Sequence, residues 1–251
     1  MSSLSNKVAL VTGGTSGIGR AAAIALANHG AKVVVSGRRE TEGKETVKLM
    51  AEAGGEGTFI QGDVTDEEHI AALIKATVDA YGSLDVAFNN AGIEGLVAPL
   101  TEQTSENIDQ VLGINVRGVL LSMKHELIQM IAQGNGGSII NTASIAGHGG
   151  IMPGPGVYVA SKHAVVGATK TAALEGAPHE IRINAVAPGG VQTDMLDRFT
   201  GGDVSQMAAM HPMGRVGTVE EIANLVVFLA SSDASFITGQ SFAADGGWLA
   251  R

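Results

Sequence analysis

The sequence contains no cysteine, which excludes disulfide bonds, thiolate catalysis and cysteine-bound metal sites. It also lacks any run of about 18 apolar residues, so no membrane span is expected. Near the amino terminus the longest apolar stretch is Val8–Val11, too short for a signal peptide. These absences are compatible with the reducing cytoplasm, and we expect that location.

Basic residues are scarce as well. Sixteen Lys and Arg stand against 25 Asp and Glu, which gives a formal net charge of -9, and they form no long run. A nucleic-acid partner needs a basic surface, so none is expected, and we attribute the acidic balance to solubility. His148, His163 and His211 stand at spacings that match no metal-ligand motif, so no metal is expected either.

Apolar residues, by contrast, make up 45% of the chain, enough for the large core of one domain. Short β-branched segments alternate with helical patterns such as Ile18–His29 and Asp66–Tyr81, which predicts a parallel sheet in a single α/β domain over residues 1–251. Continuous apolar strands such as Val33–Val35 predict helices on both faces. The predicted strands are Val8–Thr12, Lys32–Ser36, Thr58–Gln61, Val86–Asn89, Ser138–Asn141, Arg182–Ala187 and Ser241–Ala243.

A glycine-rich turn, Thr12–Gly19, follows the first predicted strand and opens a helix. Gly13, Gly17 and Gly19 let the backbone approach a ligand closely, and the helix amino terminus adds a partial positive charge. We therefore expect this turn, with Thr15, Ser16 and Ile18, to hold the pyrophosphate of a dinucleotide. A glycine turn without a ligand is the alternative.

The same turn, together with Asn89-Asn-Ala-Gly92, resembles the short-chain dehydrogenase/reductase family. The resemblance continues through Gly62-Asp-Val64, the Tyr158–Lys162 pair, Pro188-Gly189 and Asp245-Gly-Gly, and so covers the whole chain. It implies a doubly wound, Rossmann-type seven-stranded parallel sheet and hydride transfer between a nicotinamide coenzyme and a ketone or secondary alcohol. The small residues of Tyr158–Ala177 suit close packing against a symmetric mate, and the resemblance implies a second interface at Thr238–Arg251, so we expect a homo-oligomer, most simply a homotetramer.

The choice of coenzyme depends on the end of the second strand. Gly37 occupies the position where NAD enzymes of this kind usually carry Asp, and Arg38 and Arg39 follow it. An Arg can clamp a 2′-phosphate, so NADP(H) is favoured and NAD(H) is the alternative. One signal points the other way, because Ser16 stands where NADP-preferring relatives often have a second basic residue. Arg38 and Arg39 could also belong simply to a solvated loop.

The resemblance assigns further coenzyme contacts. Asp63 would receive the adenine amino group, or instead cap the helix that begins near Thr65, and Val64 would pack the adenine ring. The remaining coenzyme residues would be Asn89, Ala91 and Gly92 at the ribose, and Pro188, Gly189, Val191 and Thr193 at the nicotinamide carboxamide.

Tyr158 and Lys162 lie four residues apart, on one face of a predicted helix. A phenol with its ordinary pKa near 10 needs a depression of about three units to exchange protons near neutrality, which is about 4 kcal/mol. One cation about 4 Å away supplies roughly that much at an effective dielectric of about 20. We therefore expect Tyr158 to be the acid/base, with Lys162 binding coenzyme and, helped by the positive nicotinamide ring, lowering the phenol pKa. An exposed helix pair without chemical meaning is the alternative.

Two more catalytic residues come from the resemblance. Ser144 would hold the substrate oxygen, although it stands fourteen residues before Tyr158, one more than is usual, and Thr142 is its competitor. Asn115 would kink a helix and support a water next to the Lys162 ammonium, or else only satisfy local carbonyl groups.

The substrate pocket is expected between two loops, His148–Gly156 and Gln192–Gly217, the second acting as a lid over residues 192–217. Both loops are rich in small and apolar residues, which favours a ketone or secondary alcohol with apolar flanks; the candidate contacts are Ile145, Met152, Met195 and Phe199. The methionines of the lid could equally serve helix packing or a subunit interface. The alternative functions are an NAD-preferring alcohol, sugar or steroid dehydrogenase and a non-catalytic dinucleotide-binding protein.

Overall fold

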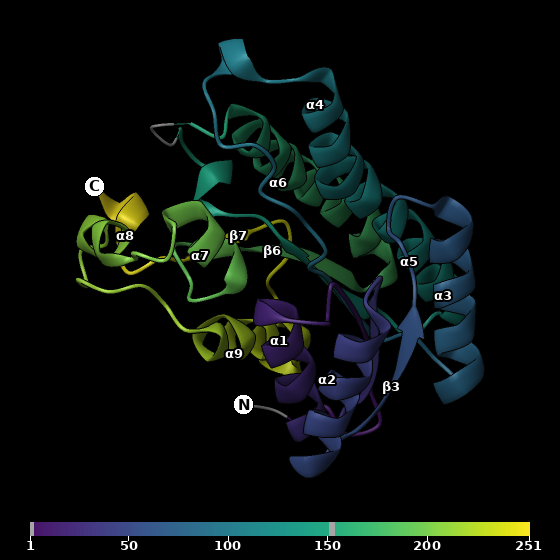
Figure 1. Cartoon of the computed structure of the whole chain (residues 1–251). Coiled ribbons are helices and arrows are strands. Elements are labelled where there is room, and N and C mark those ends of the chain that lie inside the picture. Colours follow the sequence, from purple (N-terminus) through teal and green to yellow (C-terminus); the bar gives the residue numbers. More distant parts are fainter. Residues whose placement is uncertain (1–2, 151–153) are drawn as a thin grey trace.

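A seven-stranded parallel sheet organises the chain (Figure 1). The computed structural model describes residues 3–150 and 154–251. The strand order is β3-β2-β1-β4-β5-β6-β7, as a doubly wound α/β fold requires. The strands are β1 (Val8–Thr12), β2 (Lys32–Gly37), β3 (Glu56–Gln61), β4 (Val86–Asn89), β5 (Gly137–Thr142), β6 (Ile181–Pro188) and β7 (Ser241–Ala244). Every predicted strand is therefore confirmed, with ends that differ by at most two residues.

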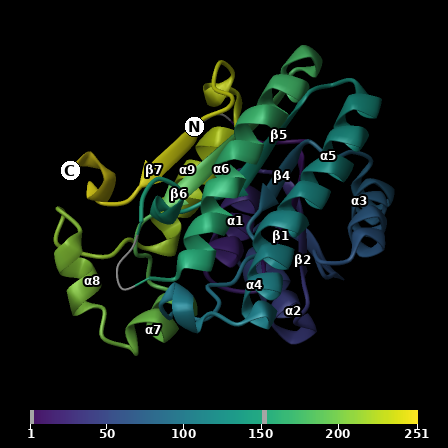
Figure 2. The same ribbon diagram turned by 90° about the horizontal axis from the view of Figure 1, so that it is seen from above.

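Helices cover both faces of the sheet (Figures 1 and 2). One layer contains α1, α2 and α9, and the other contains α3, α5 and α6. The main helices are α1 (Gly17–Asn28), α2 (Glu40–Glu52), α3 (Glu67–Tyr81), α4 (Ser105–Leu112), α5 (Val119–Gln133), α6 (Gly156–Gly176), α7 (Asp194–Thr200), α8 (Ser205–Met210) and α9 (Val219–Ala230). A π-helical turn, η2 (Gly113–Gly118), joins α4 to α5.

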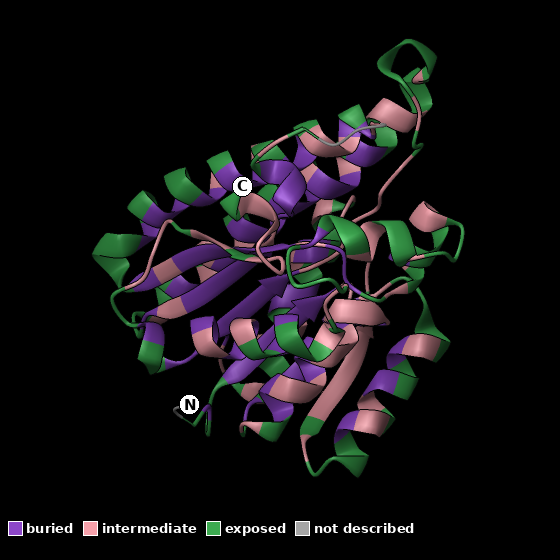
Figure 3. Ribbon diagram, turned by 90° about the vertical axis from the view of Figure 1, so that its left-hand side faces the viewer, coloured by how far each residue is buried: buried purple, intermediate pink, exposed green. Residues whose placement is uncertain are grey.

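The alternation of side chains along the strands divides the core into two halves. In β2, Val33 and Val35 face the α1 and α9 layer, whereas Val34 faces the α3, α5 and α6 layer. All three are fully buried, and Figure 3 shows the central strands as the buried centre of the molecule, whereas the edge strand β3 is only partly buried. Two-sided burial explains why these strands are continuous apolar runs rather than alternating ones.

The lid expected at residues 192–217 contains α7 and α8 rather than an irregular loop. Backbone hydrogen bonds hold the two ends of this segment together after β6: Gly217 N donates to Gly190 O at 2.8 Å, and Gln192 N donates to Gly217 O at 3.0 Å. Among the described residues, no helix is both long and apolar enough to cross a membrane.

A polar group is buried between β4, α5 and β5. Glu126 of α5 is fully buried and accepts a hydrogen bond at 2.9 Å from Asn89 Nδ2, which also donates to Asn141 Oδ1 at 3.0 Å. Within the described part of the chain, Glu126 Oε1 and Asn89 Oδ1 have no hydrogen-bond partner. A proton on Glu126 turns one of these acceptors into a donor, and burial raises the pKa of this carboxyl to about 7.

Replacing Glu126 by Gln keeps the shape of the side chain and removes its titration. Because the folded pKa of about 7 lies above the ordinary 4.5, the stability that the neutral acid contributes is complete below pH 4.5 and is lost as the pH rises through 7. The wild type should therefore lose about 3 kcal/mol relative to Glu126→Gln across this window. Denaturant unfolding at a series of pH values measures the difference, and parallel pH profiles for the two proteins would contradict it.

Candidate functional site

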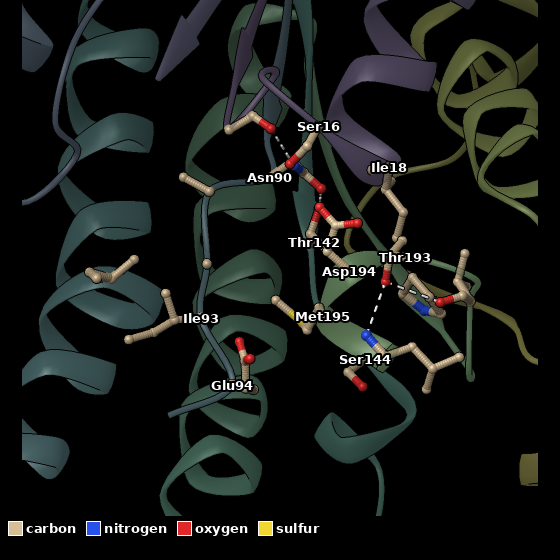
Figure 4. A pocket seen from close by; sticks show the side chains of 18 of the residues that line it. Ser16, Ile18, Asn90, Ile93, Glu94, Thr142, Ser144, Thr193, Asp194 and Met195 are labelled. Carbon is tan, nitrogen blue, oxygen red and sulfur yellow. Dashed lines mark hydrogen bonds between the residues drawn. The ribbon is translucent and has the colours of Figure 1, made fainter. Parts of the chain in front are cut away.

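A cavity of about 520 Å³ opens at the carboxyl ends of the strands, where the strand order reverses between β1 and β4 (Figure 4). Open α/β sheets bind their ligands at such a switch point. The ends of β1, β2, β5 and β6 line the cavity, together with the loops that follow β3 and β4 and with residues of α6 and α7.

The glycine turn forms one wall of this cavity. Gly13 and Gly17 have φ of +63° and +51°, which side chains other than glycine rarely adopt, and a Cβ on Gly13 would lie 2.8 Å from Ala91 Cα. Gly17 faces Thr193 across the cavity mouth, since its Cβ would lie 3.3 Å from Thr193 Cγ2. Gly19 departs from the expectation: it lies behind the turn, where a Cβ would be 2.2 Å from Gly13 O, and it serves packing rather than lining the cavity.

The amino terminus of α1 is free to receive an anion. Ser16, the N-cap residue, makes no side-chain capping bond, and the first turn of this fully described helix has no acidic residue. Thr15, Ser16 and Ile18 line the cavity beside it. The close backbone approaches and the positive helix end are features that suit a pyrophosphate, and the role of this turn stays a prediction.

Two arginines follow β2 beside the glycine turn. Arg38 lines the cavity, while Arg39 Nη2 donates to Ser16 Oγ at 2.7 Å and to Thr15 Oγ1 at 3.0 Å. Arg39 thus brings a guanidinium group to the position where the sequence offered only Ser16. The alternative of a purely solvated loop is wrong for this residue, because its side chain is tied to the glycine turn.

Asp63 and Val64 line the cavity next to Arg38. Asp63 Oδ1 accepts hydrogen bonds from Thr65 N and Oγ1 at 3.0 and 2.9 Å. Burial opposes ionisation of Asp63, but the Thr65 bonds and the charge of Arg38 keep its pKa below the ordinary value. The cap of α3 is Asp66, whose carboxylate accepts from Glu68 N, so the helix-cap alternative for Asp63 is wrong.

Asn89 was expected at the adenosine ribose, and this expectation is wrong. As the last residue of β4 it points into the core toward Glu126 and Asn141. The next residue, Asn90, faces the other way: it lines the cavity and donates from Nδ2 to Gly13 O at 3.1 Å. Ala91 and Gly92 line the cavity as expected.

The Pro188–Thr193 turn lies opposite the glycine turn, and Pro188, Gly189, Val191 and Thr193 all line the cavity. His211 supports it from behind, in a role that the sequence did not reveal. Its Nε2 accepts from Gly190 N at 3.0 Å, and its Nδ1 bonds Met207 O at 2.7 Å, so this buried ring is the Nδ1–H tautomer. Both ring nitrogens of His211 are thus engaged in hydrogen bonds, and no group of three or more potential metal ligands occurs among the described residues.

Tyr158 and Lys162 both line the cavity from α6. Lys162 is buried; its Nζ donates to Thr142 O at 2.7 Å and lies 5.5 Å from the centre of the Tyr158 ring. Burial lowers the pKa of Lys162 to about 8. Burial also raises the pKa of Tyr158 to about 12, and the charge of Glu94 raises it further. A hydrogen bond with Ser144 acts in the opposite direction and lowers this pKa. The depression expected from Lys162 is thus not produced by the protein groups alone.

Ser144 and Asn115 complete the group. Ser144 lines the cavity, and its Oγ accepts from Ala146 N at 3.1 Å, which leaves its O–H group to donate elsewhere. Its competitor Thr142 bonds Asn90 Oδ1 instead, at 3.4 Å. Asn115 lies in the π-helical turn, and its amide both donates to Ile93 O at 2.8 Å and accepts from Ile93 N at 2.9 Å.

Ile145, Met195 and Phe199, the candidate substrate contacts, line the cavity, and so does Met207. Met152 lies outside the described residues. The sequence missed two charged residues here, Glu94 after β4 and Arg198 on α7. They meet only through the fold, 104 positions apart in the chain, so no local pattern could reveal them.

Known proteins similar to this chain are consistent with the site. A sequence model of the family described as enoyl-(acyl carrier protein) reductase matches residues 13–249. The 2,5-dichloro-2,5-cyclohexadiene-1,4-diol dehydrogenase of Sphingobium indicum is 44% identical over 100% of both chains. The cyclohexanol dehydrogenase of an Acinetobacter species is 42% identical over 98% of this chain and 96% of its own. The crystal structure of levodione reductase superposes with a TM-score of 0.95 at 37% identity, covering 98% of each chain.

Proposed function

Because the chain belongs to the short-chain dehydrogenase/reductase family and is an oxidoreductase, we propose that it interconverts a cyclic secondary alcohol and its ketone, with NADP(H) as the favoured coenzyme. The observation that carries this proposal is the placing of Tyr158, Lys162 and Ser144 in one cavity with the glycine turn. A protein that only bound dinucleotide would not need these three side chains there. The names of the similar proteins support a ring alcohol.

The nicotinamide ring of the bound coenzyme supplies or accepts the hydride. In alcohol oxidation, Tyr158 Oη takes the hydroxyl proton of the substrate, and in reduction it returns that proton to the oxygen. Ser144 Oγ already accepts from Ala146 N, so its O–H group, which is hydrogen-bonded to Tyr158 in this structure, can donate to the same substrate oxygen. Lys162 has one recorded hydrogen bond among the described residues, to Thr142 O, so its other N–H groups are available for ribose hydroxyls.

Asn115 takes a positioning role in this scheme. Its amide holds the backbone of Ile93 and donates to Ser161 Oγ at 3.1 Å. A Cβ on Gly92 would lie 3.2 Å from Asn115 Oδ1 and 3.7 Å from Lys162 Nζ, so the amide and the ammonium lie on the same side of this turn. The π-helical turn thereby fixes the loop after β4 beside Lys162, where a bridging water would connect the two groups.

The preference for NADP(H) is supported by charge at the adenosine end. Position 37 offers no acidic side chain for ribose hydroxyls, and Arg38 and Arg39 both lie beside the glycine turn. A Cβ at Gly37 would lie 2.7 Å from Thr15 Cγ2, so an Asp at this position would also require Thr15 to move. Both features favour a 2′-phosphate over a free 2′-hydroxyl.

We also propose a homotetramer. Leu120, Ile128 and Ile131 of α5 expose 47%, 58% and 41% of their surface, and Leu174 of α6 exposes 78%. Apolar side chains on the outer faces of two neighbouring helices suit a symmetric contact between copies.

Tyr158→Phe tests the mechanism. The variant keeps the ring and its packing but loses the transferable proton, so it should fold and bind coenzyme while kcat for cyclohexanol oxidation falls by about 10²–10⁴-fold. Steady-state kinetics and coenzyme fluorescence titration measure the two effects. Tyr81→Phe, which removes a phenol outside the cavity, is the control. A Tyr158→Phe protein with near-normal turnover would refute the mechanism.

Arg38→Ala tests the coenzyme. Loss of a charged contact to a phosphate should raise KM for NADPH by about 10–100-fold, because such contacts contribute about 1.5–3 kcal/mol. KM for NADH should change little. Lys44→Ala removes an exposed cation of α2 and is the matched control. Equal losses with both coenzymes would contradict a contact between Arg38 and the 2′-phosphate, and a wild type with the higher kcat/KM for NADH would show that NAD(H) is favoured.

Light scattering tests the assembly. At micromolar concentration the mass should be four times the 25.5 kDa of one chain. Substituting Leu120 and Ile128 by Lys should reduce that mass, because two charges would be buried at the contact. A monomer mass for the wild type would rule the tetramer out.

A further inference from the structure

Glu94 is a carboxylate at the substrate end of an otherwise mainly apolar pocket. It follows β4 in the loop held by Asn115, and it lines the same cavity as Tyr158 and Ser144. Only 17% of its side chain is exposed. Figure 4 shows it with Met195 and Ser144 at that end of the cavity. Burying part of a charged group in such surroundings destabilises the fold unless the charge is paired, so the presence of a carboxylate here needs an explanation.

Arg198 of α7 supplies the pairing. Its Nε donates to Glu94 Oε1 at 2.6 Å and its Nη2 donates to Oε2 at 3.3 Å. This two-point contact fixes the plane of the carboxylate and joins the lid to the loop after β4. Each carboxylate oxygen can accept more than one hydrogen bond, so Glu94 keeps acceptor capacity while it is held by Arg198.

The charges at this end select against anions. Three charged residues of α7 and of the loop after β4 line the cavity: Glu94 and Asp194 are negative, and Arg198 is positive. Their net charge is therefore negative. A substrate carboxylate or phosphate would be repelled, whereas a neutral hydroxyl group could donate to Glu94. Ile145, Met195 and Phe199 provide apolar contact for the carbon skeleton that carries such a hydroxyl.

We propose that Glu94, held in place by Arg198, determines substrate specificity by accepting a hydrogen bond from the second hydroxyl group of a neutral cyclic diol, whose first hydroxyl is oxidised at Tyr158 and Ser144. This inference rests on the proposed function and names its substrate class. One similar protein is named for a ring diol and another for a ring alcohol with a single hydroxyl, so the class itself is not fixed by the resemblance.

The test compares cyclohexanediol isomers with cyclohexanol, which lacks the second hydroxyl. The wild type should show the higher kcat/KM for at least one diol. Glu94→Gln should lower the ratio of kcat/KM for that diol to kcat/KM for cyclohexanol by about 10-fold or more, the usual effect of losing a charged hydrogen-bond acceptor. Glu102→Gln, an exposed carboxylate of the same connecting segment, is the matched control.

Two further measurements separate specificity from structure. Arg198→Met should raise KM for the diol more than KM for cyclohexanol, because it releases the carboxylate that would bind the second hydroxyl group. Glu94→Gln should also move the rise of cyclohexanol oxidation to lower pH, since the Glu94 charge helps to keep the pKa of Tyr158 high. A role in folding alone would not move that pH profile.

The outcomes are distinguishable. If the wild type oxidises cyclohexanol and the diols equally well, or if Glu94→Gln affects both substrates alike, this inference is overturned while the proposed function stands. If the wild type oxidises neither substrate with either coenzyme, the proposed function fails and this inference fails with it.

Discussion

The hydrogen bond from Lys162 Nζ to the Thr142 carbonyl is the contact on which the rest of the site depends. It ties the first half of α6 to the end of β5, two residues before Ser144, and holds the ammonium group 5.5 Å from the centre of the Tyr158 ring. The contact is buried, and burial lowers the pKa of Lys162 to about 8. The fold therefore buries an ammonium group where burial disfavours its charged form, as is common at functional sites.

That arrangement has an electrostatic consequence. The protein groups around Tyr158 keep its phenol protonated, because burial outweighs the hydrogen bond with Ser144. A neutral phenol is the form needed to give a proton to a ketone. The form needed to take one from an alcohol requires added positive charge near Lys162, and the oxidised nicotinamide ring would bring it. Coenzyme binding and the readiness of Tyr158 would then be coupled.

The sequence was a good guide to the fold because two-sided burial imposes apolar runs that local reading detects. It also located the glycine turn and the Tyr158–Lys162 pair, whose spacing within one element is visible in the chain. It failed for residues whose role depends on the direction in which the side chain points or on contact with a segment far away in the chain. Asn89 and Asn90 are adjacent, but only the geometry at the end of β4 shows that Asn90 faces the cavity and Asn89 faces Glu126. Arg39 at the glycine turn, His211 behind Gly190, and Glu94 with Arg198 all depend on contacts between distant segments.

The coupling of coenzyme to Tyr158 can be measured directly, because the chain has only two tyrosines. In a Tyr81→Phe background, ultraviolet absorbance of the tyrosinate reports Tyr158 alone. Without coenzyme the phenol should stay protonated to strongly alkaline pH, in keeping with a pKa of about 12. With saturating NADP⁺ its apparent pKa should fall by about three units or more, toward neutrality. A Tyr158 pKa that does not change when oxidised coenzyme binds would contradict the account.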